Sequence, residues 1–134
     1  MASWNEVRRL ALALPQTHEE RSSSGKLWWM VAKKGFAWER PLRQSDVAAL
    51  GKKTPKGPIL GIRTADLEMK DVILASDPKV FFTTPHFDGY PAVLIQLDKI
   101  TARKLKEVLV EAWLARAPKR AAKEFLSRNS RKRE

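Results

Sequence analysis

Residues 27–39 read LWWMVAKKGFAWE, two aromatic-rich apolar segments separated by a short basic turn that contains Gly35. Aromatic and β-branched residues favour strands, and a glycine-containing turn between two such segments indicates a β-hairpin. We expect strands at residues 27–32 and 36–39, with the glycine supplying the positive φ that tight turns need. This hairpin predicts an antiparallel sheet.

The register of the hairpin determines where its tryptophans point. Trp28 and Trp29 are neighbours in one strand, so their side chains must lie on opposite faces of the sheet. A two-residue turn pairs Trp29 with Trp38 and leaves Trp28 on the outer face, whereas a three-residue turn places Trp38 beside Trp28. In either register one aromatic side chain should lie near solvent. It is either covered by the connection at residues 40–57 or available as a stacking platform for a ligand.

Helical periodicity flanks this hairpin on both sides. Ser3 and Glu6 fit the capping box that begins a helix, and apolar residues then recur at helical spacing until Pro15 stops it. A longer helix is predicted at residues 101–117, from an apolar stripe spaced i, i+3, i+4, i+7 and i+8. The stripe consists of Leu105, Val108, Leu109, Ala112 and Trp113.

The remaining elements alternate strands with short helices. The sequence predicts strands at 58–64, 79–84 and 92–97, helices at 45–50, 66–75 and 119–126, and a weakly indicated strand within 16–26. The inner face of the helix at 66–75 should hold Leu67, Val72 and Ile73. This order of elements indicates an α+β fold of two layers, an antiparallel sheet with helices chiefly on one face.

The chain is strongly basic and its charge is unevenly distributed. It has 134 residues, with 26 Lys plus Arg against 15 Asp plus Glu, and a net charge of +11. That length suits one domain, which we place at residues 1–126. Residues 116–134 hold eight basic and two acidic residues, and the last part of this stretch, 127–134, is expected to be a basic disordered tail. Such a charge favours binding to a polyanion, and nucleic acid is the first candidate.

The sequence argues against several kinds of chemistry. It contains no cysteine, which excludes disulfides, thiol catalysis and zinc–thiolate sites. The two histidines, His18 and His86, are far apart, and no cluster of histidines and carboxylates supplies three metal ligands at readable spacing. Phosphate-binding loops and a nucleophile elbow are also missing from the sequence. We therefore expect a protein that is not an enzyme and that needs neither metal nor cofactor.

The same sequence suggests where the protein works. The first ten residues include the charged Glu6, Arg8 and Arg9, where a signal peptide needs an apolar stretch. No apolar run approaches the roughly 20 residues that span a bilayer. We expect a cytoplasmic protein without a membrane partner.

Basic residues in turns and loops are candidate contacts to nucleic acid phosphates. Phosphate contacts need only positive charge and donors, so this pattern predicts affinity for DNA without sequence reading. The candidates are Lys33, Lys34, Arg40, Arg43, Lys52, Lys53, Lys56, Lys119, Arg120 and Lys123. Any one of them could equally be a solvated surface residue. The leading hypothesis is a non-enzymatic DNA-binding module with low-specificity contacts to the backbone.

The alternative hypothesis is an adaptor that binds a protein or a small ligand. His86 lies in a loop beside Phe87 and Tyr90, between two predicted strands. A histidine among aromatic residues is commonly a packed structural residue, but it can also line a pocket. In the alternative, Trp28, His86 and Tyr90 surround an aromatic pocket. Salt dependence separates the two hypotheses, because electrostatic DNA binding weakens steeply with salt and an aromatic pocket does not.

Three stretches of the chain together resemble the MmcQ/YjbR family. They read VRRLALALPQTHEE at 7–20, SDPKVFFTTPHFDGYPAVLIQLD at 76–98 and LVEAWLARAPKRAAKEF at 109–125. The resemblance covers about residues 3–126 and implies a compact fold of helices and strands. The family name carries a DNA-binding role, which is based on similarity to a double-wing domain whose hairpins contact DNA. The resemblance thus implies DNA as the partner of this chain.

Overall fold

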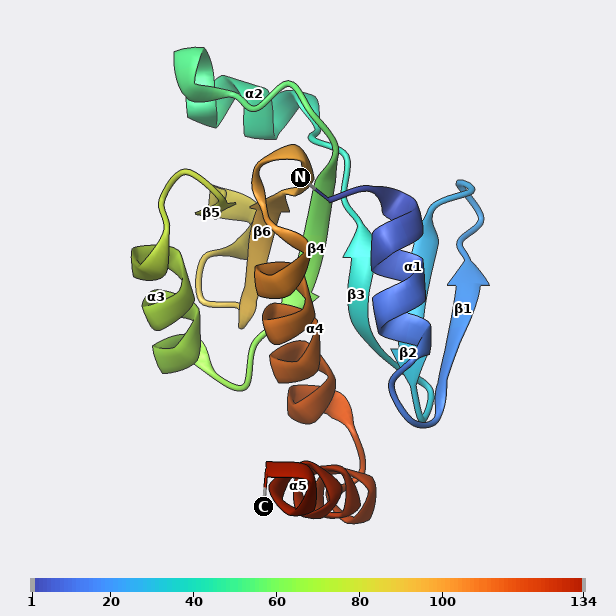
Figure 1. Cartoon of the computed structure of the whole chain (residues 1–134). Coiled ribbons are helices and arrows are strands. Elements are labelled where there is room, and N and C mark those ends of the chain that lie inside the picture. The colour runs from blue at the N-terminus through green and yellow to red at the C-terminus, as the bar shows by residue number, and fades with distance from the viewer. Residues whose placement is uncertain (1, 134) are drawn as a thin grey trace.

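The protein is built from two layers, a six-stranded antiparallel sheet and a set of helices on one face of it (Figure 1). The computed structural model describes residues 2–133, and the side-chain surroundings of residues 2–129. The helices are α1 (Trp4–Leu12), α2 (Gln44–Leu50), α3 (Leu67–Ser76), α4 (Ala102–Arg116) and α5 (Lys119–Arg133). The strands are β1 (Thr17–Arg21), β2 (Leu27–Val31), β3 (Lys34–Glu39), β4 (Ile59–Arg63), β5 (Phe81–Phe82) and β6 (Ala92–Gln96). Short 3-10 helices are η1 (Gly51–Lys53), η2 (Pro85–Phe87) and η3 (Leu97–Lys99).

The sheet has the strand order β1-β2-β3-β4-β6-β5, with every neighbouring pair antiparallel. Helices α1, α3 and α4 lie against one face, while α2 and α5 lie at opposite ends of the molecule (Figure 1). The prediction of a two-layer α+β fold with helices chiefly on one face is confirmed. Among the described residues, none of the α-helices lies along the centre of the opposite face, which is therefore open to form a site.

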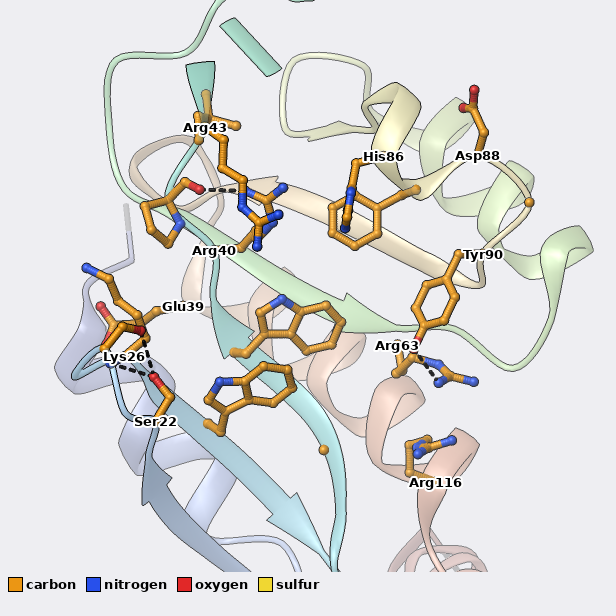
Figure 2. Close-up of a pocket in the computed structure, with 18 residues that line it drawn as sticks. Ser22, Lys26, Glu39, Arg40, Arg43, Arg63, His86, Asp88, Tyr90 and Arg116 are labelled. Carbon is orange, nitrogen blue, oxygen red and sulfur yellow. Dashed lines mark hydrogen bonds between the residues drawn. The ribbon is translucent and has the colours of Figure 1, made fainter. Parts of the chain in front are cut away.

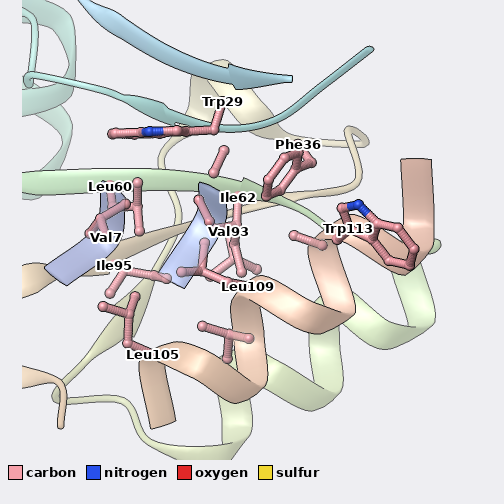
Figure 3. Packing of buried hydrophobic residues seen from close by; sticks show 14 of the residues in the cluster. Val7, Trp29, Phe36, Leu60, Ile62, Val93, Ile95, Leu105, Leu109 and Trp113 are labelled. Carbon is pink, nitrogen blue, oxygen red and sulfur yellow. The ribbon is translucent and has the colours of Figure 1, made fainter. Parts of the chain in front are cut away.

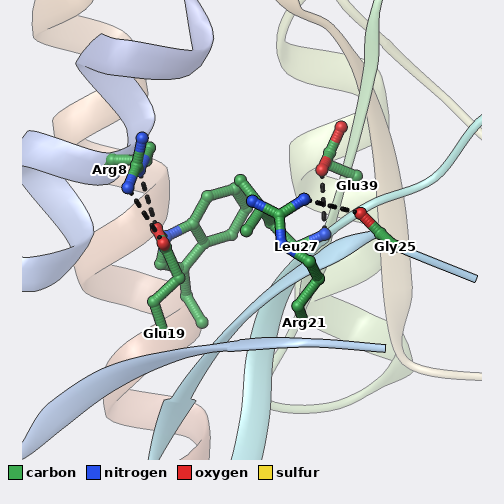
Figure 4. A network of polar contacts seen from close by, with 7 residues as sticks. Arg8, Glu19, Arg21, Gly25, Leu27 and Glu39 are labelled. Carbon is green, nitrogen blue, oxygen red and sulfur yellow. Dashed lines mark hydrogen bonds and ion pairs between the residues drawn. The ribbon is translucent and has the colours of Figure 1, made fainter. Parts of the chain in front are cut away.

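The core lies between the sheet and the helices (Figure 3). All five residues of the predicted stripe on α4 are buried. Trp113 is fully buried, and its indole Nε1 donates a hydrogen bond to the Pro15 carbonyl at 3.0 Å, so the end of the first helix is tied to α4. Trp29 is also fully buried on this face, and Figure 4 shows the contact between Arg8 and Glu19. There Glu19 accepts hydrogen bonds from the Trp29 indole at 3.0 Å and from Arg8 at 2.8 Å.

The hairpin of β2 and β3 forms as predicted, but its turn differs from both expected versions. Ala32 and Lys33 form the turn with φ of 46° and 70°, and the next residue already pairs with Val31. Positive φ at both central residues matches the right-handed twist of the strands, although residues other than glycine and asparagine rarely adopt it. The expectation that Gly35 supplies the positive φ is wrong, because Gly35 lies within β3, outside the turn. A bulge between Trp29 and Met30 then shifts the register. Trp38 consequently lies opposite Trp28, the pairing that we expected from a three-residue turn.

The weakly indicated strand within residues 16–26 is confirmed as β1, a full edge strand paired along β2. Four of its five residues, His-Glu-Glu-Arg, are polar or charged, and the pairing with β2 supplies the stability that they lack. One further expectation needs correction. On α3, Ile73 is buried but Leu67 and Val72 are 46% and 60% exposed. The inner face of this helix holds Lys70 and Ile73, and Val72 lies off that face. Leu67 is spaced i, i+3 from Lys70, but it is the first residue of the helix and stays exposed.

Helix α5 is longer than expected. It continues to Arg133, beyond Leu126, where we expected a disordered tail to begin. Lysine and arginine are good helix formers, and basic residues interact favourably with the carbonyl end of a helix. Glu134, the last residue of the expected tail, lies outside the described part of the chain.

Candidate ligand-binding pocket

A second, smaller apolar cluster lies on the open face of the sheet. It contains Trp38, Ile59, Phe87, Ala92 and Leu94, with Trp28, Leu42 and Phe82 partly buried against it. These positions alternate along their strands with residues that face the helices, because successive side chains of a strand point to opposite faces. A hollow of about 900 Å³ opens beside this cluster. Figure 2 shows the residues that line it.

The hollow has an aromatic wall. The rings of Trp28 and Trp38 stack with centroids 5.1 Å apart and planes 15° from parallel. Two glycines make room for them, since a Cβ on Gly35 would lie 2.9 Å from the Trp28 ring and a Cβ on Gly61 would lie 2.6 Å from the Trp38 ring. Trp38 is buried, whereas Trp28 is half-buried and borders the hollow. The pair therefore presents a flat aromatic surface, the kind of surface on which planar rings pack.

A loop from η2 to Tyr90 forms the wall opposite the hairpin, and a buried lysine holds it. Lys70 is 6% exposed, and its Nζ donates hydrogen bonds to the carbonyls of Phe87 at 2.6 Å and Tyr90 at 2.8 Å. Burial lowers the pKa of Lys70, with the charges of Asp88 and Asp71 partly opposing the shift. α3 thus fixes the backbone of the loop that positions its aromatic side chains.

Two arginines stand together at one side of the hollow. Arg63, at the end of β4, donates from Nη1 to the Tyr90 hydroxyl at 2.9 Å, and its Cζ lies 4.9 Å from the centre of the Tyr90 ring. Arg116, in the last turn of α4, lies near it. Burial and then the Arg63 charge lower the pKa of Arg116, with Tyr90 opposing the shift. Within the described part of the chain, neither arginine forms an ion pair, and both Nε atoms are buried without a hydrogen-bond partner.

At the other side of the hollow lie Arg40, whose charge is paired by a carboxylate, and Arg43, which is exposed. Arg40 is 6% exposed and its Nη1 lies 3.0 Å from the Asp46 carboxylate, so its charge is paired. Its Cζ also lies 5.2 Å from the centre of the Phe87 ring. Arg43 is exposed and contributes its backbone amide to Asp46 at 2.8 Å. Figure 2 shows Arg40 and Arg43 across the hollow from Arg63 and Arg116.

The structure brings together the three residues of the predicted aromatic pocket. Trp28, His86 and Tyr90 all line the hollow, although they come from β2 and from a loop far along the chain. His86 packs edge-on against Phe87, with ring centres 4.9 Å apart. Sequence reasoning missed Arg63, Arg116 and Lys70. Each lies singly at the end of a strand or within a helix, and no local pattern marks it.

The ten predicted phosphate contacts do not share one surface. Arg40 and Arg43 line the hollow, while Lys56 borders a smaller groove beside Trp4. The others are exposed in two groups: Lys52 and Lys53 on η1 at one end of the sheet, and Lys33, Lys34, Lys119, Arg120 and Lys123 at the other end (Figure 1). Arg120 also approaches Glu124 at 3.5 Å. The basic residues thus divide between the hollow and two separate ends.

Other kinds of site are less well represented. Among the residues that the structure describes, no group of three or more His, Cys, Asp or Glu side chains could hold a metal ion. No helix in that same part of the chain is both long and apolar enough to cross a membrane.

Comparisons with known proteins identify relatives along most of the chain. The YjbR family model matches residues 12–115. "Uncharacterized protein Rv2570" of Mycobacterium tuberculosis and "Uncharacterized protein Mb2600" of Mycobacterium bovis are each 47% identical over 130 residues, which cover 95% of this chain and 98% of theirs. The crystal structure of Deinococcus radiodurans protein DR2400, with a DUF419 domain, has a TM-score of 0.61 at 18% identity and covers 85% of this chain and 78% of that one. This last likeness shows a shared fold, and together with the family match it confirms the resemblance drawn from three stretches of sequence: the chain belongs to the YjbR family.

Proposed function

We propose that this protein binds a small anionic ligand with a flat ring, in the hollow on the open face of its sheet. The observation that carries the proposal is the Trp28–Trp38 stack in the same hollow as the unpaired arginines Arg63 and Arg116. A planar ring gains dispersion and stacking energy on tryptophan. An anion gains charge-assisted hydrogen bonds from guanidinium groups.

The charge of the lining residues supports an anionic ligand. Lys26, Arg40, Arg43, Arg63 and Arg116 line the hollow, against Glu39 and Asp88. The Glu39 carboxylate is engaged by the Leu27 amide at 2.8 Å, and Figure 2 shows the Asp88 carboxylate turned away from the hollow. The positive side chains therefore dominate the space that a ligand would occupy.

Binding is proposed here in preference to catalysis. Within the described residues, no hydrogen bond orients either ring nitrogen of His86, and its side chain is exposed. A general base normally needs a hydrogen-bond partner that fixes its tautomer and direction. The tryptophans and arginines, in contrast, are held by stacking, hydrogen bonds and packing. The geometry favours recognition of a ligand over its conversion.

Ligand-observed NMR with matched pairs of compounds tests this proposal. Nicotinate is compared with nicotinamide, and adenosine 5′-monophosphate with adenosine, so that each ring is presented with and without an anionic group. We expect the anionic member of at least one pair to bind more tightly, and Trp28→Leu to weaken that binding. Val72→Ser, at an exposed position on the helical side of the molecule, is the control and should change nothing. Absence of binding by every anion at millimolar concentration would overturn the proposal.

Duplex DNA is a second candidate ligand, favoured by one group of basic residues. The β2–β3 turn with Lys33 and Lys34 lies at the same end of the sheet as α5 with its exposed Lys119, Arg120 and Lys123 (Figure 1). If about five phosphates are neutralised, the logarithm of affinity should fall against the logarithm of salt with a slope of roughly −4 to −5. Contacts of this kind carry no base identity.

Fluorescence anisotropy at three salt concentrations measures this slope on random and AT-rich duplexes. Lys33→Ala with Lys34→Ala should weaken both duplexes alike, while Trp28→Leu should leave them unchanged, because the hollow is not involved. A salt-insensitive affinity, or no binding at low salt, would remove DNA as a candidate.

A further inference from the structure

We infer that Arg63, Arg116 and Tyr90 form a subsite for a phosphomonoester, so that the ligand of the hollow is a nucleotide with its base on Trp28 and its phosphate between the two arginines. The inference rests on the proposed function and specifies the ligand class for the same hollow. The nucleotide can be a free mononucleotide or the phosphorylated end of a single strand, since both present the same group.

The charge at this corner of the hollow is unbalanced. Arg63 and Arg116 approach each other from β4 and α4, and like charges at short range repel. In the described part of the chain neither is paired with a carboxylate, whereas Arg40 across the hollow is neutralised by Asp46 at 3.0 Å. An anion bound between Arg63 and Arg116 would remove this repulsion.

Arg63 and Arg116 have unused hydrogen-bonding capacity. The Nε atoms of Arg63 and Arg116 are both buried and, among the described residues, both lack a partner. Buried donors are normally satisfied, and each exception calls for a cause. A guanidinium offers Nε and Nη donors in a planar fork that matches a phosphate or carboxylate. Because both Nε atoms are buried, a ligand would first meet the Nη donors, and two guanidinium groups at one corner match an acceptor group with several oxygens.

Two arginines at one corner favour a phosphomonoester over a carboxylate. A carboxylate has two oxygens and one charge, which one arginine fork already satisfies. A phosphomonoester carries about −1.5 to −2 charge near pH 7 and three terminal oxygens. It can therefore accept from two guanidinium groups at once and balance both charges.

Arg63 is held in place before any ligand binds. Tyr90 fixes Arg63 through its hydroxyl at 2.9 Å and through its ring, 4.9 Å from Cζ. The backbone of Tyr90 is itself held by Lys70 at 2.8 Å. Preorganised donors lose less conformational entropy on binding, which favours a defined subsite over a loose cationic patch.

Isothermal titration calorimetry with adenosine 5′-monophosphate and adenosine tests the subsite. For the wild-type protein we expect the phosphate to improve affinity clearly. Arg116→Gln should weaken binding of the monophosphate roughly tenfold and leave adenosine unchanged, and Arg116→Lys should restore part of the loss, because lysine keeps the charge but not the fork. Arg103→Gln removes the same charge from an exposed position on the same helix and should have little effect.

A second variant distinguishes loss of the subsite from misfolding of the protein. Tyr90→Phe retains both arginine charges and removes only the hydroxyl that orients Arg63, so we expect a several-fold loss for the monophosphate alone. Thermal unfolding of each variant checks that the fold is intact. Equal losses for monophosphate and adenosine, or no loss with Arg116→Gln in a folded protein, would overturn the inference.

The ligand panel separates this inference from the proposed function. If nicotinate binds in a Trp28-dependent way but the monophosphate gains nothing over adenosine, the phosphate subsite is wrong and the ligand pocket stands. If no aromatic anion binds, both are wrong. Titration with a short single strand, with and without a 5′-phosphate, identifies the source: a preference for the phosphorylated strand over the free monophosphate indicates a strand end, and the reverse indicates a free nucleotide.

Discussion

Asp46 places a carboxylate oxygen 3.0 Å from Nη1 of Arg40, and both side chains are buried, at 1% and 6% exposure. Arg40 follows β3 and Asp46 lies in the first turn of α2, so the pair joins the end of the sheet to the helix that follows it. The Arg43 amide donates a further hydrogen bond to the same carboxylate at 2.8 Å. These contacts fix the chain where it leaves the hairpin and passes the hollow.

Removing one partner of this pair should be costly. Asp46→Asn keeps the size of the side chain but leaves the buried Arg40 charge without its counter-charge, for which we expect a loss of about 3–5 kcal/mol in the free energy of unfolding. Urea denaturation measures the loss. The double variant Arg40→Met with Asp46→Leu replaces both charges by apolar groups and should lie closer to the wild type. A double variant less stable than Asp46→Asn would contradict this account.

The same pair predicts how stability depends on acid. Burial tends to raise the pKa of Asp46, but the Arg43 amide and the Arg40 charge outweigh it, so the pKa is lowered from the ordinary 3.8. Between the lowered value and 3.8 the unfolded chain binds more protons than the folded one, so stability falls with falling pH in that window. The stabilisation by Asp46 is complete above the window and disappears below it. The difference between wild type and Asp46→Asn, measured by urea denaturation, should shrink as the pH falls below about 4; a constant difference would contradict the lowered pKa.

Trp113 should be among the most sensitive positions of the core. Its side chain is fully buried, packs on Phe125 with ring centres 5.1 Å apart and donates to the Pro15 carbonyl. Trp113→Ala should cost roughly 3–5 kcal/mol in the free energy of unfolding. Leu126→Ala, on α5 at 53% exposure, is the control and should stay within about 0.5 kcal/mol of the wild type. A loss below about 1 kcal/mol for the tryptophan would show that α5 and α4 repack around the gap.

The stack of Trp28 and Trp38 should require glycine at position 61. In Gly61→Ala the new methyl group would lie 2.6 Å from Cε2 of Trp38, so the indole must shift from its stacked position against Trp28. We expect a loss of about 1–3 kcal/mol from overpacking and a shifted indole N–H resonance of Trp38 in the NMR spectrum. Adding Trp38→Leu removes the ring that clashes, so the double variant should lose less than the sum of the single losses. Additive losses would show that the glycine serves another purpose.

Lys70 should control the order of the loop beside the hollow. Lys70→Met keeps the length of the side chain and removes both donors to the carbonyls of Phe87 and Tyr90. Amide hydrogen exchange at these two residues should become faster, because their own amides are bonded within the same loop. Lys79→Met changes an exposed lysine and should leave the exchange rates as they are. Unchanged protection in Lys70→Met would show that the turn hydrogen bonds hold the loop by themselves.

The parts of the fold that could be predicted are those with a local pattern. Trp113 and Leu105 lie on a helical stripe that needs no knowledge of the partner, and both are fully buried. The register of the hairpin depends on a bulge after Trp29, which no turn motif indicates, so the partner of Trp38 stayed open. β1 escaped firm prediction because its polar residues are stabilised by pairing with β2. Pairing energy of this kind arises only in the folded sheet.

The residues of the site also differ in whether the sequence alone could identify them. Trp28, His86 and Tyr90 were identifiable because aromatic residues cluster in their segments. Arg63 is positioned at the hollow by its contact with Tyr90, 27 positions later in the chain. Arg116 is positioned there because the last turn of α4 ends beside the hollow. Residues so far apart in the chain meet through the sheet order, which periodicity does not specify.

The two edges of the sheet have a consequence for the behaviour of the protein at high concentration. An open sheet exposes unpaired backbone groups at both edges, where a strand from another molecule can add. β1 presents His18, Glu19, Glu20 and Arg21 along one edge, and β5 consists of two residues only. Charged side chains and a very short strand are both devices that discourage such addition. The polar character that made β1 hard to recognise as a strand therefore protects the molecule from growing into cross-strand aggregates, even though its sheet is not closed.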